Sequence, residues 1–61
     1  MKKIEKINII IGIIENNTSA MFGELIKDEG FKKLLLNELK ISNDISATAD
    51  KLSKYANKHL I

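Results

Sequence analysis

The sequence predicts an all-α protein, a small bundle of three to four short helices that forms a single domain over residues 1–61. Apolar residues recur every three to four positions along several segments, which is the period of one face of a helix. Short clusters of Ser, Thr, Asn and Asp separate these segments, and these residue types are preferred at helix N-termini. The chain also contains no proline that would interrupt a helix.

The first expected helix covers residues 3–14 and is rich in isoleucine. One arc of its helical wheel holds the isoleucines that we expect to face the core: Ile4, Ile7, Ile10, Ile11 and Ile14. The alternative is a buried strand, because β-branched isoleucine favours sheets and Gly12 weakens a helix. A short N-terminal strand followed by helices would give a ribbon-helix-helix-like dimer, although a ribbon faced with isoleucine could not read DNA bases. The regular spacing of the five isoleucines favours the helix.

A second helix is expected after a polar break at residues 16–19, which offers N-cap residues. Its apolar stripe consists of Met21, Phe22, Leu25 and Ile26. Gly30 followed by Phe31 fits a Schellman ending, in which a left-handed glycine closes the helix and the next apolar residue packs back on it. Two oppositely charged i,i+4 pairs span this glycine and would instead favour an unbroken helix. Because Phe31 does not continue the stripe, we expect a break or sharp bend near Gly30.

Two further helices are expected beyond the bend. The stripe of the third consists of Phe31, Leu34, Leu35 and Leu39, with Leu36 off it. The capping cluster at residues 42–44 predicts that the last helix begins at Ile45 and continues to His59. Its apolar face consists of Ile45, Ala49, Leu52, Ala56 and Leu60. Asp50 and Lys54 form a favourable i,i+4 pair on the opposite side.

Residues that could perform catalysis are scarce. Cysteine is absent, and His59, the only imidazole, is close to the C-terminal end. A nucleophile therefore has no well-placed base, and the three glycines are too far apart to form a phosphate-binding loop. No spacing of metal-binding side chains occurs. We expect no enzymatic activity, no metal and no cofactor.

The charge pattern offers an alternative function. Ten lysines stand against eight acidic residues, and arginine, which dominates contacts to phosphate and guanine, is absent. Lys51, Lys54 and Lys58 nevertheless line one side of the last expected helix, where they could contact a phosphate backbone. The alternative is therefore a dimeric, lysine-rich transcriptional regulator that binds nucleic acid. A membrane-active peptide is disfavoured by the acidic residues spread along the chain.

The N-terminal segment only partly resembles a signal peptide, because Glu5 and Asn8 interrupt the pattern. The apolar run is also too short to cross a bilayer. We therefore expect a cytoplasmic protein.

Three apolar residues lie off the core stripes of their helices and suggest an interaction surface. They are Ile9, Ile13 and Leu36. A domain of this size buries little apolar surface and usually needs a disulfide, a metal or a partner. We expect these residues to contact another protein or a second copy of the chain. The sequence thus predicts a small, non-catalytic regulatory or inhibitor protein, of the kind that phages and mobile elements encode, which binds a larger protein through apolar helix faces.

Overall fold

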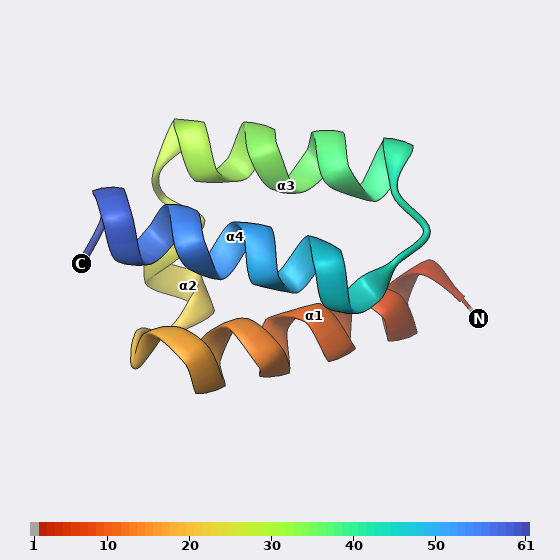
Figure 1. The fold of residues 1–61 in the computed structure, drawn as a ribbon, viewed down its shortest axis with the longest axis horizontal. Coiled ribbons are helices and arrows are strands. Elements are labelled where there is room, and N and C mark those ends of the chain that lie inside the picture. The colour runs from red at the N-terminus through yellow and green to blue at the C-terminus, as the bar shows by residue number, and fades with distance from the viewer. Residues whose placement is uncertain (1) are drawn as a thin grey trace.

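The computed structural model describes residues 2–61 and folds them into four helices: α1 (Lys3–Thr18), α2 (Phe22–Leu25), α3 (Glu29–Ile41) and α4 (Ile45–His59). In Figure 1, α4 lies between α3 and α1, and the single turn of α2 joins the C-terminal end of α1 to the N-terminal end of α3. The helix packing is dominated by α1 against α4, followed by α3 against α4. Residues 2–61 contain no strand. The all-α bundle is therefore confirmed, and the ribbon-helix-helix alternative is wrong.

Helix α1 is longer than the sequence predicted, and the break expected at residues 16–19 is largely helical. Thr18 closes the last turn, because its hydroxyl donates to the carbonyl of Ile14 (2.8 Å) and accepts from the N–H of Ala20 (3.3 Å). Ser19 then adopts a left-handed conformation with φ 60° and ends the helix. Burial in the bundle offsets the low helix propensity of isoleucine. Fully burying a side chain such as Ile10 is worth about 1.5–3 kcal/mol, which exceeds the helix-propensity penalty of at most about 0.7 kcal/mol.

The expected Schellman ending at Gly30 is also wrong. Helix α2 ends at Leu25, and a turn over residues 26–28 leads into α3, so that Gly30 lies in the first turn of α3. Gly30 does not adopt the left-handed conformation. Asp28 starts α3 by accepting a hydrogen bond from the N–H of Phe31 (2.9 Å), a stronger signal than the glycine. The bend near Gly30 thus exists but precedes the glycine.

Helix α4 has the bounds that the sequence predicted. Asp44 caps it by accepting from the N–H of Ala47 (3.0 Å), as the cluster at residues 42–44 indicated. The ion pair of Asp50 with Lys54 is present, with 3.1 Å between Nζ and Oδ2. The cap, the ion pair and the apolar stripe all specify the same helix.

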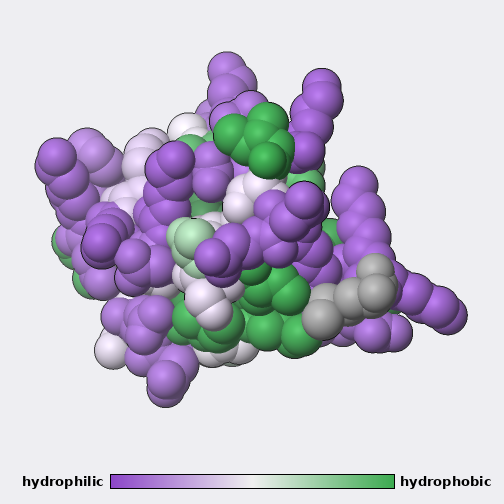
Figure 2. All heavy atoms as spheres, turned by 45° about the vertical axis from the view of Figure 1, so that its right-hand side comes forward, coloured by the Kyte–Doolittle hydropathy of each residue, from purple (hydrophilic) through white to green (hydrophobic). Residues whose placement is uncertain are grey.

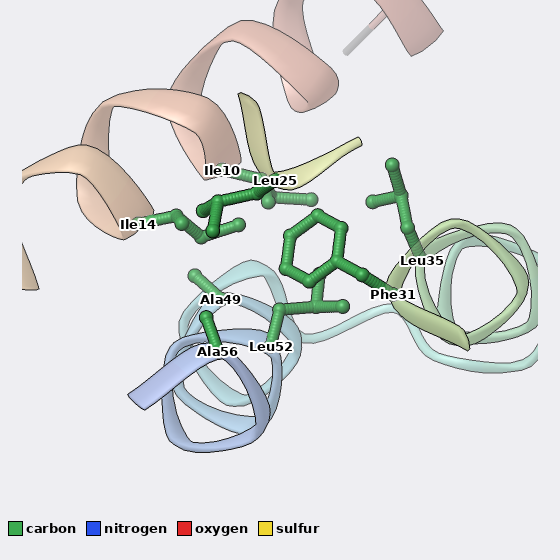
Figure 3. Close-up of a cluster of buried hydrophobic side chains, with 8 residues drawn as sticks. All are labelled: Ile10, Ile14, Leu25, Phe31, Leu35, Ala49, Leu52 and Ala56. Carbon is green, nitrogen blue, oxygen red and sulfur yellow. The ribbon is translucent and has the colours of Figure 1, made fainter. Parts of the chain in front are cut away.

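The core is a small cluster of buried side chains between α1, α3 and α4, with α2 adding one residue (Figure 3). Its members are Ile10, Ile14, Leu25, Phe31, Leu35, Ala49, Leu52 and Ala56. Three members of the arc predicted for α1, Ile4, Ile7 and Ile11, are not buried. Ile13, predicted to lie off the arc, packs against the core instead. The buried side of α1 is therefore rotated towards α4, because α4 is its main packing partner.

Candidate protein-binding surface

One side of α1 carries isoleucines that the bundle leaves uncovered. Helix α2 lies on this side, since the carboxylate of Glu15 accepts from the N–H of Phe22 (2.8 Å). Ile4 and Ile11 share a row with Glu15, because residues seven and four apart lie on one side of a helix. Helix α2 is too short to reach them. Ile4 is 62% exposed, whereas Ile7 and Ile11 are half-buried and do not belong to the side chains that pack against the core.

The side of α3 that points away from α4 also carries apolar residues. Glu38 faces α4, where its carboxylate pairs with Lys51 (Nζ–Oε2 3.3 Å). Leu36 is two residues away and therefore points about 200° from Glu38, with 57% of its surface exposed. Leu39 is half-buried beside it. Figure 3 shows the neighbouring Leu35 extending from α3 at the edge of the core cluster and away from α4.

These two rows form what we term the α2-side surface. It consists of Ile4, Ile7, Ile11, Leu36 and Leu39. The α1 row leads to Glu15, where α2 lies against the C-terminal end of α1. Of these residues, Ile4 and Leu36 are exposed, Ile7 and Ile11 are half-buried, and Leu39 is half-buried against the core.

Lysines border this surface. Lys32 and Lys40 lie one turn on either side of Leu36, and Lys3 lies one turn before Ile7; all three are exposed. The ion pairs among residues 2–61 involve other lysines, namely Lys27, Lys51 and Lys54. Lys3, Lys32 and Lys40 therefore form no ion pair with any of the described residues. The carboxylates on the same side, Glu15 and Glu29, lie near the α2 end.

The three partner-binding residues predicted from the sequence do not form one patch. Ile9 is 43% exposed and Ile13 is half-buried. Both lie on the α4 side of α1, in a row that begins at Lys6 and ends at Asn17. Lys6 bonds to the segment before α4, and Asn17 bonds to α4 itself. Those bonds run from Lys6 Nζ to the Ser42 carbonyl (2.9 Å) and from Asn57 Nδ2 to the Asn17 carbonyl (3.4 Å). Leu36, by contrast, is on the α2 side of α3. In Figure 2, the face turned forward has an apolar area over α1, bordered by hydrophilic side chains.

The predicted nucleic-acid contacts lie on the solvent side of α4. Lys51, Lys54 and Lys58 are exposed there. Two of the three are paired with carboxylates, Lys51 with Glu38 and Lys54 with Asp50. The pairing lowers the positive potential that a phosphate backbone would meet. Nucleic-acid binding by these lysines remains a prediction.

Tyr55 links α4 to the start of α3. Its hydroxyl donates to Asp28 Oδ2 (3.4 Å), and its ring lies 6.4 Å from that of Phe31 and 4.8 Å from that of His59. Partial burial raises the pKa of Tyr55 above its ordinary value of 10.0, and the charge of Asp28 and the hydrogen bond to it add to the rise. At neutral pH the hydroxyl therefore keeps its proton and can donate.

Over the part of the chain that the structure describes, no pocket is present and no group of three His, Asp or Glu side chains could hold a metal ion. None of the helices in residues 2–61 is long and apolar enough to cross a membrane. Comparison with known proteins gave no match: no family model fits the sequence, and neither a curated protein nor a solved structure is similar to it.

Proposed function

We propose that this chain is a small, non-catalytic regulatory protein that binds another protein through its α2-side surface and inhibits it by covering a functional region. The observation that carries the proposal is the exposure of two large apolar side chains on different helices, Ile4 on α1 (62%) and Leu36 on α3 (57%). A chain of 61 residues that leaves large apolar side chains in water has surface suited to burial against a partner.

The core supports the same interpretation. Two of its eight members are alanines, which bury little area, and small domains are marginally stable for this reason. Association would bury further apolar surface and add to the stability of the fold. The chain therefore gains from a partner both a function and a more stable structure.

The test is quantitative capture from a lysate of the source organism, with wild-type protein and with the double variant Ile4→Lys/Leu36→Lys as baits. We expect the wild type to retain a specific protein that the double variant loses. The matched control is Ile41→Lys, because Ile41 is as exposed (66%) but lies outside the α2-side surface. If the double variant and the wild type retain the same proteins, the proposed function is wrong.

A further inference from the structure

We infer that the α2-side surface accepts an amphipathic helix of a partner protein, with carboxylates flanking the apolar stripe of that helix. This inference rests on the proposed function and specifies the chemistry of the partner. It follows from the shape, the composition and the charged border of the surface.

The shape favours a helix. Helices α1 and α3 run antiparallel on either side of α4, and the short α2 connects the C-terminal end of α1 to the N-terminal end of α3 (Figure 1). An added helix would lie along Ile4, Ile7 and Ile11 on one side and along Leu36 and Leu39 on the other. Ile4, Ile7 and Ile11 have the i, i+3, i+7 spacing, and Leu36 and Leu39 the i, i+3 spacing, of stripes that interdigitate with a second helical stripe.

The charged border favours carboxylates on that helix. Lys3, Lys32 and Lys40 flank the apolar rows, and the described part of the chain supplies none of them with an ion-pair partner. The two acidic residues on this side are concentrated near α2, where Glu15 already accepts from a backbone N–H. A helix carrying glutamate or aspartate beside its apolar stripe would place opposite charges against Lys3 and Lys40.

The same border argues against a second copy of this chain as the occupant. The uncovered helix that a second copy would offer is α1, and the lysine that borders its apolar row is Lys3. Lys3 would meet Lys32 or Lys40 of the first copy. Like charges across an interface disfavour association.

The test uses two synthetic stapled helical peptides, each about 14 residues or four turns long. Both have leucines at i, i+3, i+4 and i+7; one has glutamates flanking the leucines and the other has lysines at those positions. Binding to the full chain is measured by fluorescence anisotropy. We expect the acidic peptide to bind at least about tenfold more tightly than the basic peptide at low salt.

Variants of the protein then locate the binding. Leu36→Ser should weaken the acidic peptide about tenfold, whereas Ile41→Ser should leave its affinity unchanged; circular dichroism checks that each variant is folded. Lys32→Glu/Lys40→Glu should reverse the preference, so that the basic peptide binds more tightly. This reversal distinguishes a specific charged border from general stickiness.

Equal binding of the two peptides, binding of neither, or no reversal in the charge-swapped variant would overturn the inference. A dimer in light scattering that the Ile4→Lys substitution dissociates would also overturn the inference, because a second copy would then cover the surface. The proposed function would survive any of these peptide results if the capture from lysate still depended on Ile4 and Leu36. The two proposals therefore fail separately.

Discussion

Alanine substitution of Gly12 and of Gly30 should change stability in opposite directions, although both glycines lie within helices. Gly12 is in the middle of α1 and exposed, and a Cβ added there would meet no atom within 4 Å. A glycine in a helix interior costs about 0.8–1.0 kcal/mol relative to alanine. Gly12→Ala should therefore raise the free energy of unfolding by about that amount.

Gly30 is covered by the ring of Tyr55. A Cβ at Gly30 would collide with the Tyr55 hydroxyl and would lie 3.2 Å from Tyr55 Cζ and 3.1 Å from Asp28 Oδ2. Inserting a methyl group into a packed site costs about 1–3 kcal/mol, and the helix-propensity gain of at most about 1 kcal/mol offsets part of this. We expect Gly30→Ala to lower the free energy of unfolding by about 1 kcal/mol.

The two variants should thus differ by about 2 kcal/mol. Urea unfolding followed by circular dichroism resolves this difference, since a slope near 1 kcal/mol/M separates the midpoints by about 2 M. As a control, Gly30→Ala should become neutral or stabilising when Tyr55 is also replaced by alanine. If Gly30→Ala alone stabilises the protein as much as Gly12→Ala does, the described packing of α4 on the start of α3 is refuted.

Three further predictions concern buried and titrating side chains. The Thr48 hydroxyl is buried with no hydrogen-bond partner among residues 2–61, so Thr48→Val should stabilise the fold by about 1 kcal/mol in urea unfolding. Thr18→Val should destabilise it, because the Thr18 hydroxyl makes two hydrogen bonds; the same sign for both would contradict this reasoning. Ile14→Ala should cost about 2–4 kcal/mol in the same assay, whereas Ile4→Ala should cost less than about 0.5 kcal/mol. Because the folded-state pKa of Tyr55 is raised, its stabilising contribution should be complete below pH 10 and disappear as the pH rises through the folded-state pKa. Tyr55→Phe should remove that part of the pH dependence, and an unchanged alkaline profile would show that Tyr55 does not cause it.

The elements predicted most accurately from the sequence are those with local signals at both ends. Helix α4 has a capping Asp44, an apolar stripe at one period and an internal ion pair, and its bounds agree with the structure. Helix α2 is one turn long, and its first N–H is bonded by Glu15, seven residues before it. A capping group supplied by another helix leaves no local signal, so the break at residues 16–19 was misplaced.

The binding surface was harder to predict than the fold. Seven isoleucines on α1 occupy more of the circumference than one core face can bury, and the sequence does not indicate which of them α4 will cover. Ile4, Ile7 and Ile11 were assigned to the core for this reason, whereas Ile13 was assigned to the surface. Leu36 was correctly placed outside the core, because Phe31, Leu34, Leu35 and Leu39 form one consistent stripe that excludes it. Buried Glu38 could not be predicted, since its burial depends on Lys51 in the next helix.

Methyl NMR spectra of the isoleucine, leucine and methionine side chains, recorded during titration with the acidic helical peptide, would test the proposed binding surface most directly. The methyl resonances of Ile4, Ile11 and Leu36 should shift together and saturate at one peptide concentration. Those of Met21 and Ile41, which are 67% and 66% exposed but lie outside the α2-side surface, should remain in place. Shifts concentrated at Met21, Ile41 or Ile9, with Ile4 and Leu36 unaffected, would contradict the assignment of the α2-side surface as the site where this protein binds its partner.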